Sequence, residues 1–291
     1  MELQYEDIYI AFRRIFCYSV FMEPLFSYRE PGLYCHHSLD AFPDPALFPI
    51  HAHEMPEVYC FLSGKGQFLV EGSHYLLSPG DILLMRPAET HKLLIEPDEP
   101  YRRIAVHFSP QFFERIDPDR RLLQPFYARA LGQHNHYPAS RFPALSSVFS
   151  NLVLTPGLER FAILSRLLQL LTDISAIYPE ISGESQPVGG FPSELVAYVN
   201  AHLYEELSLS MIARSFAHSV SQISRTFREA TGTSLWEYVM MKRLLSARAM
   251  LQRGETAQKS AEACGFSDYS AFFRAYKKRF GHAPGEDRPG L

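Results

Sequence analysis

The C-terminal third of the chain carries one local pattern twice: a short helix, a tight turn and a second helix with one apolar side. The first copy spans residues 209–232 and the second spans residues 255–281. In the first copy, Ile223 and Phe227 stand four residues apart and place an apolar stripe on one helix face. This spacing predicts two helix-turn-helix units within an all-helical C-terminal domain.

The segment between the two units, residues 235–252, is predicted to form one helix of 18 residues. At 1.5 Å per residue it is about 27 Å long, which suits two recognition helices held about 34 Å apart, one turn of B-DNA. A recognition helix needs an apolar side that seats it and a polar side that reaches base edges. The pattern therefore predicts binding to double-stranded DNA, with Arg243 and Arg248 exposed on the connecting helix.

These residues resemble the AraC family of bacterial transcription regulators over about a third of the chain. The resemblance rests on the following positions: Leu209-Ser210-Met211-Ile212-Ala213, Ser219, Ile223-Ser224-Arg225, Phe227, Gly232, Tyr238, Arg243-Leu244, Ala247, Leu251, Gly265-Phe266-Ser267-Asp268, Phe272, Arg274, Lys277-Lys278, Gly281, Pro284 and Arg288. It implies base-facing side chains in both units: Ser221, Ser224 and Arg225 in the first, and Tyr269, Ser270 and Arg274 in the second. Arg228 and Lys278 are expected on the DNA backbone, because half or more of protein–DNA hydrogen bonds go to phosphate and sugar.

One position departs from the family pattern. In the helix before Gly265, where the family usually has Ile followed by Ala, this chain has Ser260 and Ala261. A small polar residue packs less firmly than Ile. The first unit, around Arg225, is therefore predicted to contribute more of the DNA sequence specificity than the second.

The distribution of charged residues also separates the C-terminal third from the rest of the chain. Residues 192–291 contain 13 Lys and Arg against 10 Asp and Glu, whereas residues 1–191 contain 15 against 22. Only the C-terminal part is net positive, as expected of a part that binds a polyanion. The turn-rich stretch 178–191 is predicted to link an N-terminal domain, 1–177, to a DNA-binding domain, 192–291.

The four cysteines are widely spaced and form no Cys-x-x-Cys pair: Cys17, Cys35, Cys60 and Cys264. Such spacing is typical of a protein that keeps its thiols reduced. The N-terminus lacks a basic stretch before an apolar one, and no apolar run approaches the length of a membrane helix. The prediction is a cytoplasmic protein.

Residues 27–109 are predicted to form short strands separated by turns that contain Gly or Pro. The predicted strands are 57–62, 67–71, 74–77, 81–86 and 103–108. Short strands at this spacing favour an antiparallel barrel or jelly roll. The predicted fold class is therefore α+β, with an N-terminal barrel plus helices and an all-α C-terminal domain.

A group of histidines and acidic residues in this region resembles the two motifs of the cupin fold: His51-Ala52-His53, Glu57, Gly64, Gly80-Asp81 and His91. The chain departs from those motifs at Pro45 and at Ala88, where Gly is usual. The resemblance implies that metal ligands fall on His51, His53, Glu57 and His91. Alternate residues of a strand share a face, so both histidines of the pair are expected to point into the barrel.

Two interpretations of this group stay open. Three imidazoles and a carboxylate suit Zn, Fe, Mn or Ni. Alternatively the pocket is metal-free and hydrogen-bonds a small-molecule effector, which is the preferred interpretation, with these residues: His51, His53, Glu57, Tyr59, His91 and His107. Relatives with this domain layout commonly respond to sugars, so the resemblance implies a sugar as the effector.

The preferred hypothesis is a ligand-responsive transcription regulator that binds promoter DNA as a homodimer and is not an enzyme. Residues 160–177 are predicted to form a helix whose apolar surface is wider than one packed face needs. That helix either contributes to the dimer, as the family resemblance implies, or packs wholly within its own domain. A metal-dependent cupin enzyme and a metal or redox sensor are the alternatives, but no further acid or base at a recognisable spacing supports catalysis.

Overall fold

The computed structural model describes residues 23–150, 156–182 and 190–289. Its N-terminal part contains a six-stranded antiparallel sheet, ordered β1-β2-β8-β3-β6-β9, and a three-stranded antiparallel sheet, ordered β5-β4-β7. The strands are β1 (Glu23–Glu30), β2 (Leu33–Asp40), β3 (Glu57–Ser63), β4 (Gly66–Val70), β5 (Ser73–Leu76), β6 (Ile82–Met85), β7 (His91–Ile95), β8 (Tyr101–Phe108) and β9 (His136–Tyr137). The α+β fold class predicted from the sequence is confirmed.

Both faces of the central strands of the six-stranded sheet are buried. Tyr59 and Phe61 of β3 pack into the core between the two sheets, together with Phe68 of β4. Val58 and Cys60 alternate with them and belong to a second core on the opposite face. Because both faces are covered, a central strand such as β6 is apolar at every position and does not alternate.

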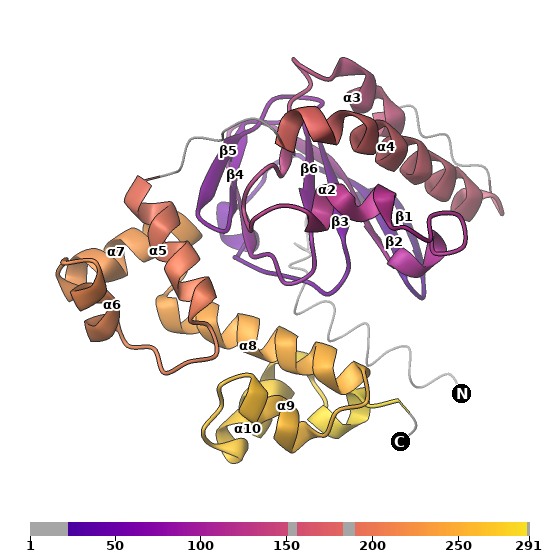
Figure 1. The fold of residues 1–291 in the computed structure, drawn as a ribbon. Helices are drawn as coiled ribbons and strands as arrows, with labels where there is room; N and C mark the ends of the chain where they lie inside the picture. Colours follow the sequence, from indigo (N-terminus) through magenta and orange to yellow (C-terminus); the bar gives the residue numbers. More distant parts are fainter. Residues whose placement is uncertain (1–22, 151–155, 183–189, 290–291) are drawn as a thin grey trace.

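Helices cover that opposite face, as Figure 1 shows for α3 (Pro143–Ser150) and α4 (Glu159–Ser182). The buried side chains of α4, among them Ile163, Leu167 and Leu171, join the same core as the strands. Within the described residues, α4 is the one helix long and apolar enough to cross a membrane, and 33% of the stretch that meets this criterion is buried. The prediction that no apolar run reaches such a length was therefore wrong. The other helical segments here are η1 (Pro45–Leu47), η2 (Pro110–Phe112), η3 (Arg121–Leu123) and α2 (Gln124–Tyr127).

The C-terminal part is helical, with α8 running between two helix pairs (Figure 1). Its elements are α5 (Gly190–Ala201), α6 (Leu209–Ser215), α7 (Val220–Thr231), α8 (Leu235–Gln252), α9 (Ala257–Ala263), α10 (Tyr269–Phe280) and η4 (Pro284–Asp287). Ser219 caps α7 by accepting from Gln222 N–H, and Asp268 caps α10. Gly232 and Gly281 end these two helices at positive φ, which glycine adopts without strain. Both predicted helix-turn-helix units are present.

Four strands and the linker differ from the sequence predictions. The strands β1, β2, β7 and β9 were not predicted, because polar residues interrupt their apolar pattern. The predicted linker overlaps the end of α4 and the start of α5, and its residues 183–189 lie outside the described residues. The helix continues past residue 177 because Ile181 joins the core and the Tyr178 hydroxyl donates to the carbonyl of Ala128 at 2.5 Å.

Candidate functional site

Polar residues gather on the inner face of the six-stranded sheet. In the strand register Glu57 of β3 lies opposite His107 of β8, which lies opposite Tyr34 of β2. The segment before β3 and the first residue of β7 add His53 and His91. The pocket at this place is lined by His36, Leu47, Phe48, Pro49, His51, Glu57, Tyr59, Phe68, His91, Leu93, Tyr101, Arg103 and His107.

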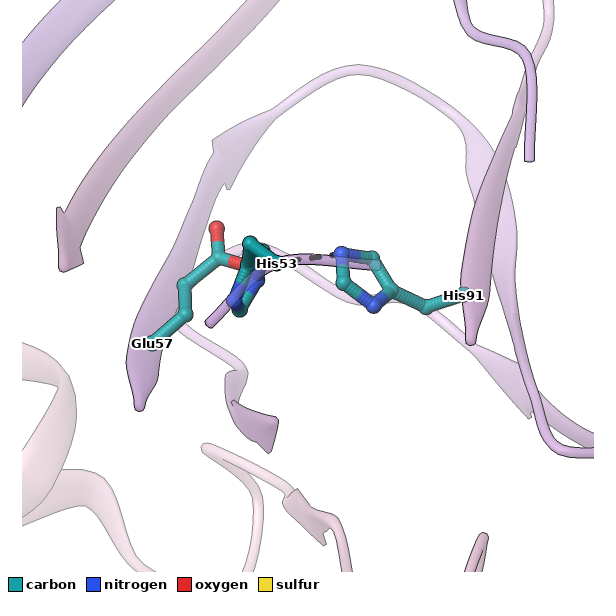
Figure 2. A group of neighbouring side chains, drawn as sticks. All are labelled: His53, Glu57 and His91. Carbon is teal, nitrogen blue, oxygen red and sulfur yellow. Dashed lines mark hydrogen bonds and ion pairs between the residues drawn. The ribbon is translucent and has the colours of Figure 1, made fainter. Parts of the chain in front are cut away.

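One carboxylate in this pocket is surrounded by imidazoles. Figure 2 shows His53, Glu57 and His91 pointing toward one another from separate segments. Nε2 of His53 lies 2.8 Å from Oε2 of Glu57, and Nε2 of His91 lies 3.4 Å from the same oxygen. Nε2 of His107 lies 3.7 Å from the other carboxylate oxygen. All four side chains are buried.

This arrangement determines the charges in the pocket. Burial raises the pKa of the Glu57 carboxyl, but His107 and the hydrogen bonds from His53 and His91 outweigh burial and hold that pKa well below its ordinary value. Burial lowers the pKa of His107 to about 3. Burial also lowers the pKa of His91, but the hydrogen bond and negative charge of Glu57, together with Glu89, outweigh burial and raise that pKa overall. At neutral pH the pocket therefore holds an ionised Glu57 beside a neutral His107.

The donor set fits a divalent metal ion. The ligand atoms of His53, Glu57 and His91 all lie within 4.8 Å of one another. Nδ1 of His53 is 2.6 Å from the Met55 carbonyl oxygen and Nδ1 of His91 is 2.9 Å from the Glu89 carbonyl oxygen, so both Nε2 atoms face the group's centre. Imidazole nitrogen and carboxylate oxygen are ligands that Zn²⁺, Mn²⁺ and Fe²⁺ accept.

A buried ion pair holds the turn that precedes His91. Both Glu89 carboxylate oxygens accept from Arg129, at 2.6 and 2.7 Å, and neither side chain of the pair is exposed. Arg129 also donates to the carbonyl of Leu84 on β6. Because the Glu89 carbonyl in turn fixes the His91 ring, this pair pre-organises one wall of the pocket.

The pocket lining also includes hydroxyl groups, a guanidinium and aromatic rings. The hydroxyls of Tyr59 and Tyr101 are 2.6 Å apart, and Arg103 Nη1 donates to the Tyr101 hydroxyl at 3.0 Å. Arg103 Nε donates to His36 Nε2 at 3.2 Å, and Phe48 packs edge-on against Tyr101. Such a lining offers hydrogen bonds and ring contacts to a small polar ligand.

The structure brings the predicted effector-site residues together. Five of them line the pocket, and His53 completes the group around Glu57. Among the predicted metal ligands, His51 lies beside this group, with its ring 4.3 Å from that of His91, but is not part of it. His36, Tyr101 and Arg103 were missed. The last two alternate with His107 along β8 and were detectable, whereas His36 lies on a strand that was not predicted.

The predicted DNA-facing residues of the first unit lie on the open side of α7. Ile223 and Phe227 are fully buried, and the opposite side carries Ser221, Arg225 and Arg228, which are exposed, and Ser224, which is half-buried. On α10 the buried stripe is Phe272, Tyr276 and Phe280. Across from it the exposed residues are Tyr269, Ser270, Arg274 and Lys278.

Arg243 and Arg248 are not exposed, so that prediction was wrong. Arg243 is 5% exposed, and its guanidinium donates to three backbone carbonyls: Leu203 at 2.7 Å, Glu205 at 2.6 Å and Gly265 at 2.6 Å. It thereby ties the loop before α6 and the turn after α9 to α8. The Arg248 side chain is 21% exposed and pairs with Glu54 and Asp287.

Ser260, the departure from the family pattern, is fully buried in α9. Its hydroxyl has no hydrogen-bond partner among the described residues. Burying a hydroxyl without a partner costs free energy, so we expect Ser260→Ala to raise the free energy of unfolding by about 1 kcal/mol. Urea denaturation measures this, with Ser165→Ala on the exposed side of α4 as control. A loss of stability in Ser260→Ala would contradict the assignment of an unsatisfied hydroxyl.

Comparison with known proteins identifies both parts. Residues 40–171 match the model of the AraC-like ligand binding domain, and residues 212–289 match that of a helix-turn-helix domain. The HTH-type transcriptional activator RhaS of Escherichia fergusonii is 25% identical over 275 residues, covering 87% of this chain and 96% of RhaS. RhaS of Enterobacter sp. is 24% identical over 279 residues, with the same coverage.

Among solved structures, ToxT of Vibrio cholerae O395, bound to (E)-4-(8-methylnaphthalen-1-yl)but-3-enoic acid, is 14% identical with a TM-score of 0.38, covering 88% of this chain and 97% of ToxT.

The two matched domain models occur in one chain in the order barrel, then helix-turn-helix. The chain therefore belongs to the AraC family of transcription regulators and is a ligand-responsive DNA-binding protein with a cupin-like N-terminal domain.

Proposed function

We propose that this regulator binds a sugar or a closely related polyhydroxylated molecule in the barrel pocket and changes its binding to promoter DNA in response. The observation that carries the proposal is the pocket's mixture of groups. Glu57 accepts hydrogen bonds, Arg103 donates them, and the Tyr59 and Tyr101 hydroxyls do both, beside the ring of Phe48. A sugar presents hydroxyls around its edge and an apolar face, which matches this mixture.

The proposal includes activation of transcription, since the relatives reported above are transcriptional activators. It assigns effector binding to residues 1–177 and DNA binding to residues 192–291, in the cytoplasm. The DNA contacts proposed are the open faces of α7 and α10. No catalytic role is assigned to the pocket.

We further propose a homodimer in which α4 takes part. Phe161 is 63% exposed on α4, and Leu158, just before it, is 53% exposed. Leu164, Leu168 and Ile177 are only partly buried against the core. An apolar strip of this kind is suited to pairing with a second copy of the chain. Size-exclusion chromatography with light scattering tests this: Phe161→Glu is expected to give monomers, whereas a wild-type monomer would contradict the dimer.

A metal sensor is the second candidate, and the grouping of His53, Glu57 and His91 specifically favours it. When bound, a divalent ion would supply a Lewis-acidic site for ligand oxygens. His53 and His91 would hold it through Nε2 and Glu57 through its carboxylate. The carbonyls of Met55 and Glu89 already orient both rings for that role.

Thermal-shift measurements on the full chain separate these functions. A ligand that binds only the folded state stabilises it and therefore raises the melting temperature. At a free ligand concentration of 100 times the dissociation constant, the free energy of unfolding increases by about 2.7 kcal/mol. We expect a dose-dependent rise with one sugar class that is lost in Tyr59→Phe and Glu57→Gln and kept in His74→Ala, an exposed control. No rise with any sugar would contradict the sugar proposal.

Metal is tested in the same protein by adding Zn²⁺ and by elemental analysis after dialysis. The metal-sensor function requires about one equivalent of bound ion per chain, lost in His53→Ala. A sugar response that persists in EDTA, with no retained metal, would eliminate the metal-sensor function.

A further inference from the structure

The hairpin between β4 and β5 has an unusual residue at its tip. Val70 pairs with Ser73, so the turn consists of Glu71 and Gly72, which have φ values of 49° and 86°. Asn, Asp and Gly are the usual residues where both turn positions have positive φ, and Glu is strained there. Hairpin tips are also ordinarily exposed. Glu71 is nevertheless only 6% exposed, so contacts of its side chain must offset the strain.

Those contacts join the barrel to the DNA-binding domain. One carboxylate oxygen of Glu71 accepts from Thr90 N–H at 2.6 Å and from the Thr90 hydroxyl at 2.9 Å, and lies 2.7 Å from Nζ of Lys242. The other accepts from Asn200 Nδ2 at 2.8 Å and from the Tyr238 hydroxyl. Thr90 belongs to the barrel, whereas Asn200 lies on α5, and Tyr238 and Lys242 lie one turn apart on α8.

This network is closed to water. The charged side chains of Glu71 and Lys242 are 1% and 5% exposed, and Lys242 also donates to Asn200 Oδ1 at 2.8 Å. Burial, followed by the Glu71 carboxylate, raises the pKa of Tyr238 well above its ordinary value, so its hydroxyl remains a donor. Removing one partner of a buried ion pair leaves the other charge uncompensated, which strongly disfavours the docked arrangement.

The same barrel segment also reaches the pocket. Glu71 N–H donates to the Thr90 carbonyl at 3.0 Å, and the next residue, His91, contacts Glu57 in the pocket. Successive residues of an extended segment point to opposite sides. Thr90 therefore meets the network at α8 while His91 faces the pocket.

A second segment repeats this alternation. His51 lines the pocket and His53 contacts Glu57. Between them, Ala52 is fully buried in a core made otherwise mainly of α8 and α10 side chains. Glu54 lies 3.2 Å from Nη1 of Arg248 on α8. Every pocket histidine on these two segments thus has a neighbour in contact with the DNA-binding domain.

From these contacts we infer that the buried Glu71 carboxylate couples the state of the pocket to the DNA-binding domain by fixing α5 and α8 to the strand that carries His91. The inference rests on the proposed function in one respect, that the pocket is the effector site. In the docked arrangement Arg225 and Arg274 remain exposed. The contact therefore governs how the DNA-binding helices are held and does not cover them.

Hydrogen–deuterium exchange on the full chain without ligand tests the docking. In Glu71→Gln, which leaves Lys242 buried without its counter-charge, amide exchange in α5 and the first half of α8 is expected to rise about tenfold or more. Glu71→Gln combined with Lys242→Met removes both charges and should give a smaller rise, which keeps the test available if the single variant unfolds. The control is Glu96→Gln, in the exposed Lys65–Glu96 pair beside the same three-stranded sheet. Unchanged exchange in α5 and α8 in both variants would overturn the inference.

A pocket substitution tests the coupling. Glu57→Gln, or His91→Gln if that protein unfolds, is expected to change exchange in α5 when Glu71 and Lys242 are intact. The same substitution added to the Glu71→Gln/Lys242→Met protein should leave α5 exchange unaltered. An equal change in both backgrounds, or none in either, would overturn the coupling. Since no ligand is added, failure of every sugar and of Zn²⁺ to bind would instead count against the proposed function alone.

Discussion

Arg243→Met is expected to lower the free energy of unfolding by about 3 kcal/mol or more. The variant loses three buried hydrogen bonds from the guanidinium, and charge-assisted hydrogen bonds are stronger than neutral ones. The Arg243 guanidinium donates to backbone carbonyls that precede and follow α8 in the sequence. Leu203 and Glu205 lie before the first unit, and Gly265 lies within the second. The space beside Gly265 is equally restricted, since a Cβ there would lie 2.6 Å from the Tyr204 carbonyl oxygen. The two units are therefore held together at this point.

Urea denaturation followed by circular dichroism measures the effect. Arg243→Lys retains the charge but not the planar fork, so it is expected to lose most of the same stability. Arg253→Met, exposed just after α8, serves as the matched control and should change stability by less than about 0.5 kcal/mol. An Arg243→Met protein as stable as this control would show that the three carbonyl contacts do not hold the units together.

Arg225→Ala and Arg274→Ala are each expected to weaken binding to the preferred DNA site by about 1–3 kcal/mol and to relax base preference at one position. Both side chains are exposed across from the buried stripe of their helix, where a base edge can be reached. Arg225→Ala should have the larger effect, because α9, which supports α10, carries the buried Ser260 hydroxyl.

Fluorescence anisotropy at fixed salt measures these affinities. Lys278→Ala is the comparison, since loss of a phosphate contact should weaken all sequences alike and reduce the salt dependence. Lys65→Ala, on the barrel, should leave DNA affinity unchanged. Specific affinity that survives both Arg substitutions would mean that the recognition residues lie elsewhere.

The DNA-binding half was predictable because its signals are local. The caps at Ser219 and Asp268, the glycines at Gly232 and Gly281 and the four-residue apolar spacing all act within one helix or turn. Arg243 was mispredicted for the opposite reason. Its partners lie 22 to 40 residues away in sequence. The local helix pattern does not include them and therefore predicted a charged side chain that faces solvent.

The pocket was predictable as a set of residue types, but only in part as a geometry. His51, His53, Glu57 and His91 follow a recognisable spacing, whereas His36 reaches the pocket through a strand pairing that spans most of the barrel sequence. Glu71 could not be predicted, because a Glu-Gly pair between two strands normally indicates an exposed turn. Its burial depends on α5 and α8, more than a hundred residues later in the chain.

Selection of random DNA duplexes by the intact protein tests most directly whether two unequal helix-turn-helix units read DNA. The wild-type chain is predicted to enrich sequences with two motifs about one helical turn, roughly 10 base pairs, apart on the duplex. Arg225→Ala should relax the base preference at one position of one motif, and Arg274→Ala at one position of the other. No enrichment at about 0.15 M salt, or identical motifs from wild type and both variants, would contradict the account.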